Sequence, residues 1–431
     1  MKRFFLFLMV LLFVFSTTVY ARGGGDSSGG RTKIVWADWA LAEDALKPIY
    51  EKCIASFTSK NPDIEIEPFT LPYASYIDQM LIATAAGNAP DVIRIKNEWV
   101  PEYHAVGAFR DIRSFINKNV LDDFYPGSLD SLTMDGKLIG LSWQNGTYVL
   151  FYNKALLSRA GITQLPRTLD ELVAAAYKIS ALGTDARGNK IYGMAIPASG
   201  GVESNEGINI YPMLWGYGGD LLDSSKRVNL TNAPAIKAFT TIQKLFVDGI
   251  SPVGSTFKDT RNLYGQGVLG FVWDTSGPGA AAPEQAAPNK EEYWQNLGTM
   301  VIPRESGPNG HAYVSEQSMA VTRTVSDAKM PAVARFLEQQ TGYEVLNILY
   351  ENNQNKTSNR KSVMEAFRTK DNPIFLTCVE TSNSIKFFPY VNFIETDKLL
   401  SDALTMLAQG RNVNTVMQET QTKIQALFDK K

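Results

Sequence analysis

One stretch decides the fold of this chain: "VLFYNKALLSRAGI", residues 149–162. It begins as an apolar run, passes through the polar step Tyr152-Asn153-Lys154, and continues with the apolar spacing of a helix. A strand that turns directly into a helix is also the setting of a catalytic elbow, but no nucleophilic side chain stands at this junction. Aromatic and polar residues precede it in "LSWQNGTY", residues 141–148. We therefore predict that the chain crosses here between two lobes.

The residues before this crossing alternate between strand and helix patterns. Strand patterns cover residues 32–40, 62–69 and 89–95, and apolar residues at helical spacing fill 46–57 and 73–86 between them. This β-α-β-α-β order predicts a sheet with helices packed on its faces.

A second block of the same kind follows the crossing. Thr168 and Glu171 have the spacing of a capping box, and Thr231 or Asn232 is positioned to cap a later helix. The remaining predicted elements are strands at 190–197, 266–274, 298–303 and 316–322, followed by mostly helical sequence from 332 onward. Because the alternation occurs in two blocks, the sequence predicts the α/β class with two lobes. A length of 431 residues likewise predicts two domains.

The N-terminus predicts export. Lys2 and Arg3 precede an apolar run, and small residues lead to Ala21, so residues 1–21 have the pattern of a signal peptide. The alternative is an anchor that stays attached. Residues 22–31, which include "RGGGDSSGG", are predicted to form a flexible tether. Arg22 stands where a lipid-bearing Cys would be needed, so we expect no lipid anchor and a periplasmic or extracellular protein.

Composition excludes several classes of function. The net charge is −2 and no polybasic segment remains after the signal peptide, so nucleic acid is not an expected partner. Two Cys and two isolated His are too few for a zinc site, and no phosphate-binding loop or nucleophile elbow is present. We expect no metal and no cofactor. Cys53 and Cys378 either pair or lie buried as small apolar groups, and burial is the favoured alternative.

Aromatic residues with polar neighbours stand at the ends of predicted strands and in loops. Ligands of open α/β sheets bind beyond the carboxyl ends of strands. Sugars require this mixture, because their C–H faces pack on rings while their hydroxyls need planar polar partners. A single Trp is more often part of a core, and Trp36, inside a strand pattern, is expected to be one. Asp91, at the start of a strand, is expected to orient a loop.

Five segments in order resemble the extracellular solute-binding proteins of ABC importers, of the maltose-binding-protein-like type. They are "ATAAGNAPDVIRI" (83–95), "VLFYNKALLSRAGI", "PRTLDELVAAAYKI" (166–179), "YGGDLLD" (217–223) and "AVARFLEQQTGYEV" (332–345). The resemblance implies two α/β lobes joined by crossing segments, the first near residues 142–146, with a ligand in the cleft between them. It implies a first lobe of residues 32–143 plus 317–360 and a second of 144–316 plus 361–431.

The resemblance also implies where the ligand binds. The positions that correspond to ligand contacts are Asp38 and Trp39, then Asn97, Glu98 and Trp99, then Trp143 and Asn145, then Asn209, Tyr211 and Trp215, then Trp273 and Asp274, with Tyr76 and Glu316 as secondary candidates. The chain departs from some relatives in having Asn145-Gly146 where they have an acidic residue, which leaves the substrate open.

The implied function is non-enzymatic binding of a mono- or oligosaccharide by a monomer that delivers it to a membrane permease. A sugar phosphate is an alternative ligand, but the basic residues expected near the site are few, which argues against a strongly anionic one. Two other functions stay open: an exported carbohydrate-active enzyme, a glycosidase or lyase, which needs facing carboxylates, and a binding protein that docks on a chemoreceptor.

Overall fold

The computed structural model describes residues 27–28, 30–125, 127–200, 206–308, 310–370, 372–381, 385–386 and 392–430. The predicted signal peptide lies outside the described residues, as does most of the predicted tether. Its described part includes β1 (Ser27–Ser28), which pairs antiparallel with the start of β2 (Arg31–Ala37). Among the described helices, none is both long and apolar enough to cross a membrane.

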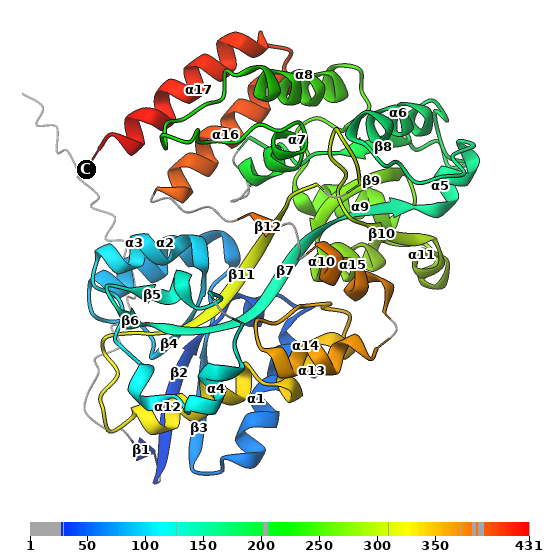
Figure 1. Cartoon of the computed structure of the whole chain (residues 1–431). Helices are drawn as coiled ribbons and strands as arrows, with labels where there is room; N and C mark the ends of the chain where they lie inside the picture. The colour runs from blue at the N-terminus through cyan, green and yellow to red at the C-terminus, as the bar shows by residue number, and fades with distance from the viewer. Residues whose placement is uncertain are drawn as a thin grey trace, which may run out of the picture.

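The first lobe is an α/β layer structure (Figure 1). β2 pairs in parallel with β3 (Ile64–Phe69) and β4 (Val92–Lys96), as the strand-helix alternation predicts. The other elements of this lobe are η1 (Trp39–Ala42), α1 (Lys47–Lys60), α2 (Tyr73–Ala85), η2 (Asn97–Trp99), α3 (Val100–Ala105), η3 (Arg113–Phe115), α4 (Lys118–Asp123), η4 (Asp130–Leu132), β5 (Thr133–Met134), β6 (Lys137–Leu138), α12 (Met330–Gln340), α13 (Tyr343–Glu351) and α14 (Lys361–Arg368).

The second lobe is also α/β, with β8 (Tyr192–Ala195) parallel to β9 (Leu269–Thr275). Its helices begin with local caps, because Thr168 accepts a hydrogen bond from the Glu171 backbone and Asn232 from Ala235. The other elements are α5 (Lys154–Arg159), α6 (Leu169–Ser180), η5 (Gly207–Ile210), α7 (Tyr211–Gly216), α8 (Ala233–Val247), α9 (Phe257–Gly265), α10 (Ser276–Ala281), η6 (Pro283–Ala286), α11 (Lys290–Asn296), β10 (Leu297–Met300), α15 (Pro373–Thr381), β12 (Ile385–Lys386), α16 (Phe393–Ala408) and α17 (Val413–Phe428).

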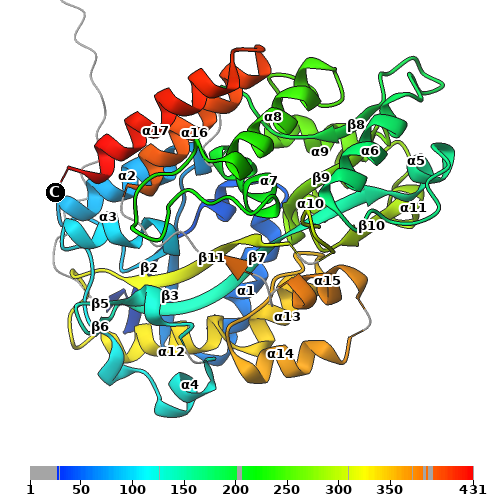
Figure 2. The same ribbon diagram turned by 45° about the horizontal axis from the view of Figure 1, so that its top comes forward.

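Two long strands connect the lobes. β7 (Gly140–Asn153) and β11 (Ala312–Val321) pair antiparallel and run diagonally from one lobe to the other in both ribbon views (Figures 1 and 2). β7 pairs with β9 and β10 in the second lobe, whereas β11 pairs with β4 in the first. The opening stretch "VLFYNK" is thus the second-lobe end of a strand that begins in the first lobe.

A third connection follows α13. The backbone of Thr357 exchanges two hydrogen bonds with that of Asn145 on β7, at 2.9 and 3.2 Å. The next helix, α14, contacts the first lobe, since Ser362 donates hydrogen bonds to Asp123 from its hydroxyl and its backbone. We therefore propose that the first lobe extends through Arg368, beyond residue 360.

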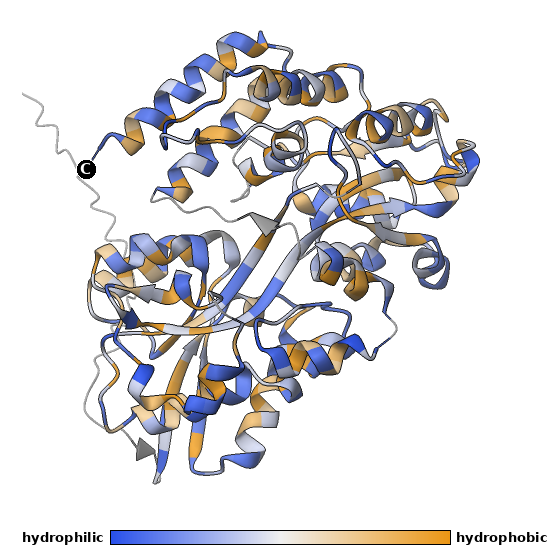
Figure 3. Cartoon of the chain, in the orientation of Figure 1, coloured by the Kyte–Doolittle hydropathy of each residue, from blue (hydrophilic) through white to orange (hydrophobic). Residues whose placement is uncertain are grey.

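Apolar residues fill the space between sheet and helices in both lobes, and the surface helices alternate polar and apolar segments (Figure 3). Trp36 is fully buried with its ring against Trp143 and Phe336, which confirms its expected place in the core. Asp91 accepts hydrogen bonds from the Val35 backbone at 2.8 Å and from Lys329 at 2.7 Å, and it is structural as expected.

The two cysteines do not pair. Cys53 lies in the core on α1 and Cys378 lies in the second lobe on α15, and both are buried thiols that form no disulfide. Burial raises the pKa of each thiol to about 12, so both are unreactive at neutral pH.

Candidate functional site

A cavity of about 670 Å³ lies where the lobes face each other. That volume is within the range of small-molecule sites, roughly 300–1,000 Å³. Its walls come from both lobes, from both crossing strands, and from the third connection. The lining side chains that matter below are Trp39, Glu43, Tyr50, Tyr73, Arg94 and Lys96 of the first lobe, Tyr148, Tyr313 and Gln317 of the crossing strands, Phe257, Arg261 and Asp274 of the second lobe, and Lys356.

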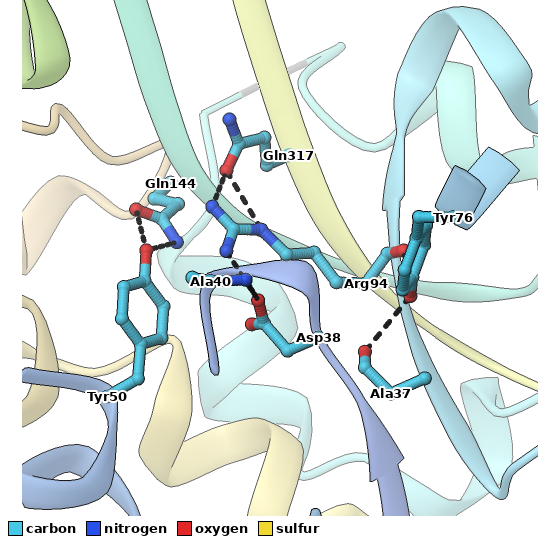
Figure 4. A network of polar contacts seen from close by, with 8 residues as sticks. All are labelled: Ala37, Asp38, Ala40, Tyr50, Tyr76, Arg94, Gln144 and Gln317. Atoms are coloured by element: carbon cyan, nitrogen blue, oxygen red, sulfur yellow. Dashed lines mark hydrogen bonds and ion pairs between the residues drawn. The ribbon is translucent and has the colours of Figure 1, made fainter. Parts of the chain in front are cut away.

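Arg94 organises the first-lobe wall (Figure 4). Its Nη1 donates to Asp38 Oδ1 at 2.7 Å, and its Nε donates to Gln317 Oε1 on β11 at 3.0 Å. Asp38 comes directly after β2 and also caps η1 by accepting from the Ala40 backbone at 2.7 Å. The guanidinium carbon lies 4.0 Å from the centre of the Trp39 ring. The fixed guanidinium thus holds a ring at the cavity wall.

Lys96 and Tyr313 form a second polar group beside it. Tyr313 donates to Glu98 Oε1 at 2.5 Å, and the Lys96 ammonium lies 4.0 Å from the same oxygen. Burial raises the pKa of Glu98, while the Lys96 charge opposes that shift. The Tyr313 ring packs edge-on against Tyr148 at 5.2 Å, so two rings from opposite crossing strands meet at the cavity.

The second-lobe wall is built at the end of β9. Asp274 accepts two hydrogen bonds from Arg261 of α9, at 2.7 and 3.0 Å, and a third from the Thr275 backbone at 2.6 Å. This bidentate pair fixes both side chains. Phe257, at the start of α9, adds an apolar surface to the same wall, with its ring near the Arg261 guanidinium.

The third connection closes the cavity on one side. Ser276 at the start of α10 donates to the carbonyl of Asn355 at 2.9 Å, which ties residues 352–356 to the second lobe. Gly277 fits against the same segment with no room for a side chain, because a Cβ there would lie 2.2 Å from the Gln354 carbonyl oxygen. The segment that carries Lys356 is therefore held by close backbone packing.

We expect Gly277→Ala to destabilise the protein by about 1–3 kcal/mol, since the added methyl must displace the backbone of Gln354. Urea unfolding of the wild type and the variant checks this. Ala281→Gly on the same helix is the matched control, and its cost of at most about 1 kcal/mol reflects helix propensity alone. Equal costs for the two variants would show that the close approach to Gln354 carries no strain.

Two of the predicted ligand-binding residues, Trp39 and Asp274, line the cavity. Others lie directly behind its wall and hold the lining residues in place. Asp38 anchors Arg94, Glu98 bonds Tyr313, and the Tyr76 hydroxyl donates to the Arg94 carbonyl at 2.8 Å. The rings of Trp99 and Trp143 are fully buried and pack against Trp39 and Tyr50 respectively.

The remaining predicted residues are not among those that line the cavity. Asn97 bonds Ser131 and Ser318, Asn145 bonds Asn359, Glu316 accepts from Ser142 and Asn359, Asn209 donates to the Glu206 carbonyl, Tyr211 and Trp215 pack on each other in α7, and Trp273 is fully buried in β9. For the three on strands, Asn145, Trp273 and Glu316, the physical reason is alternation, because a strand residue faces either the core or the cleft and its position alone does not say which. The other four lie in the helical segments η2, η5 and α7, whose packing against neighbouring elements decides which side chains reach the cavity.

Sequence reasoning missed the charged part of the cavity. The expectation of few basic residues was wrong, because Arg94, Lys96, Arg261, Lys290 and Lys356 all line it. A signal was present in "VIRIK", where two cations interrupt a strand that is otherwise apolar and whose five residues are all buried. Lys and Arg are rarely buried without a partner or a function. In the described part of the chain, no cluster of His, Cys, Asp or Glu is placed to hold a metal ion.

Comparison with known proteins agrees with this architecture. A family model described as "Bacterial extracellular solute-binding protein" matches residues 39–338. Binding proteins of Brucella abortus are 27% identical over 266 residues, which is 61% of this chain and 61% of their own length. The galactooligosaccharide-binding protein of Bacillus subtilis is 24% identical over 319 residues, 71% of this chain and 70% of that protein.

Solved structures show the same fold. The maltose-bound MalE3 protein of T. maritima has a TM-score of 0.79 and 21% identity, with 92% of this chain and 99% of that chain covered. The GacH receptor of Streptomyces glaucescens has a TM-score of 0.79 and 20% identity, covering 92% and 98%. The fold is thus the two-lobe periplasmic-binding-protein fold.

Proposed function

Because the chain belongs to the family of bacterial extracellular solute-binding proteins, we propose that it binds a carbohydrate between its lobes and delivers it to a membrane ABC permease. Its role is binding and not catalysis. The observation that carries the ligand class is the cavity wall, where ring faces alternate with fixed charged and amide groups drawn from both lobes.

Saccharides match this wall chemically. The rings of Trp39, Tyr73, Tyr148 and Phe257 offer apolar surfaces for sugar C–H groups. Charged and amide groups such as Asp274 offer partners for hydroxyls, which must be satisfied when they leave water. The related protein of Bacillus subtilis is named for galactooligosaccharides and another, from Streptomyces coelicolor, for diacetylchitobiose. A mono- or short oligosaccharide is consistent with about 670 Å³.

We infer delivery of the ligand to a permease from the fact that residues of both lobes line the cavity. A ligand that contacts both walls binds the closed arrangement more tightly than an open one, and so shifts the population toward closure. The crossing strands β7 and β11 and the segment around Thr357 are the positions where such a motion bends. The closed pair of lobes is the form that we propose the permease recognises.

Intrinsic tryptophan fluorescence and thermal denaturation test the proposal. A panel of mono- and disaccharides is titrated, and we expect at least one to change the emission and to stabilise the protein by about 2.7 kcal/mol at a hundred times its dissociation constant. Trp39→Phe is expected to lose most of the emission change. Trp215→Phe replaces an indole that packs on Tyr211 in α7 and does not line the cavity, so this matched control keeps the emission change. No response to any saccharide would refute the carbohydrate assignment.

We further propose that residues 1–21 direct export and are then removed, and that the mature protein acts as a monomer outside the cytoplasm without a lipid anchor. Arg22 at the junction supports the last point, since acylation there needs a thiol.

A further inference from the structure

One buried cation in the cavity has no bonding partner among the described residues. Lys356 lies in the segment between α13 and α14, is 4% exposed, and lines the cavity. Its ammonium makes no hydrogen bond or ion pair with any residue that the structure describes. A Cβ on Gly146 of β7 would lie 3.3 Å from its Nζ, which places that atom against the crossing strand. Lys356 is thus a buried cation at the wall of the cavity, beside the crossing strand β7.

The other buried cations of the cavity are already matched. Arg94 is bonded to Asp38 and Gln317, and Arg261 is held by both oxygens of Asp274. Lys96 lies 4.0 Å from Glu98 and near the faces of two rings. Asp38, Asp274 and Glu98 already serve these other cations. Glu43 also lines the cavity, but it forms no ion pair with Lys356 in the described part of the chain.

The backbone holds this lysine in place. Thr357, the next residue, is fixed to Asn145 by two backbone hydrogen bonds, and Asn355 accepts from Ser276 and from Asn372. The segment therefore cannot shift away from the cavity without breaking its contacts to β7 and to the start of α10. A buried charge of this kind is costly unless something pairs with it.

We propose that the saccharide bound in this cavity is acidic, a uronic acid or an oligosaccharide containing one, and that its carboxylate pairs with the Nζ of Lys356. The inference rests on the proposed function and narrows its ligand class. A hydroxyl would satisfy one donor of the ammonium, whereas a carboxylate also neutralises the charge. Because Lys356 lies on the third connection with its Nζ beside Gly146 of β7, this ion pair forms between the lobes, where closure excludes water.

A dependence on pH follows. Burial, reinforced by the positive charges of Arg94 and Lys96, lowers the pKa of Lys356 to about 7. The titratable and charged groups that interact with it electrostatically are Arg94, Lys96, Arg261, Asp274, Glu43 and Cys378. Above pH 7 the free lysine is neutral and must take up a proton to pair with a carboxylate. We therefore expect the affinity for a uronate to fall by about tenfold for each pH unit above 7, and to be level below it.

Calorimetric titration tests the proposal with D-glucuronate, D-galacturonate and their disaccharides against the matched neutral sugars. At pH 6.5 we expect the acidic sugar to bind about 10- to 100-fold more tightly than its neutral counterpart. Lys356→Met is expected to abolish that difference and the pH dependence. Lys244→Met is the matched control, because it removes an exposed lysine of α8 outside this cavity and changes the net charge equally. We expect it to keep both the affinity difference and the pH dependence.

The wild-type pH profile keeps the proposal testable if Lys356→Met fails to fold. A neutral sugar that binds as tightly as the acidic one, or a sugar phosphate that binds more tightly than the uronate, overturns this inference while the proposed function stands. Absence of binding to every saccharide, acidic or neutral, overturns the proposed function itself.

Discussion

Replacement of Asp38 by Asn destabilises the protein by about 3–5 kcal/mol, because it leaves the guanidinium of Arg94 buried without a counter-charge. Both side chains of this pair are almost fully buried, 0% exposed for Asp38 and 3% for Arg94. Asn still accepts the hydrogen bonds of Arg94 and of the Ala40 backbone, so the loss of stability measures the effect of removing the negative charge. Urea unfolding at pH 7 measures it.

A surface pair provides the control. Arg335 and Asp63 are 2.5 Å apart, yet both are about half exposed. Solvent screens such pairs, so Asp63→Asn is expected to cost far less than Asp38→Asn. The double variant Asp38→Asn with Arg94→Met removes the stranded charge, and we expect it to lose less than the two single variants together. The explanation fails if Asp38→Asn costs no more than Asp63→Asn.

The second large effect concerns Glu316 on β11 at the hinge. It accepts hydrogen bonds from Ser142 at 2.9 Å and Asn359 at 2.6 Å. Burial, with a contribution from the charge of Glu98, raises its pKa from 4.5 to about 7 despite those hydrogen bonds. Between these two values the unfolded chain releases a proton that the folded protein retains. Stability is therefore lost as the pH rises from about 4.5 to 7, by on the order of 3 kcal/mol, and the loss is complete above pH 7.

Glu316→Gln isolates this contribution. Gln keeps an oxygen to accept from Ser142 and Asn359 but carries no charge at any pH. We expect the variant and the wild type to have similar free energies of unfolding near pH 4.5 and the variant to be more stable by on the order of 3 kcal/mol at pH 8. The difference between the two proteins removes the background of other titrating groups. A difference that is constant with pH would contradict the assignment.

The aromatic residues show how far the candidate site was predictable. The sequence predicted that rings from separate parts of the chain meet at a cleft, and Trp39 does line it. The ring neighbours Tyr50, Tyr73 and Tyr313 were not predicted, whereas Trp143 and Trp273 were predicted and are fully buried. A Trp at a strand end has the same sequence pattern whether its ring faces the core or the cleft, so only the packing of the neighbouring elements separates the two.

Local signals in the sequence by themselves determined the elements. Apolar periodicity set β2, α2 and β4, side-chain caps set the starts of α6 and α8, and the change from strand to helix period at residues 149–162 located the entry into the second lobe. These features depend on residues close together in the chain, which is why they can be read without the fold.

Only the tertiary structure decided the chemistry of the cavity. Arg94 is paired with Asp38 and Gln317, which are 56 and 223 residues away in sequence, and Asp274 is bonded to Arg261. Among the described residues, Lys356 forms no ion pair. Whether a buried charge has a partner depends on which distant side chains the fold brings within a few ångströms of it. That proximity is a property of the packed lobes, since the Coulomb interaction depends on distance in space and not on separation along the chain.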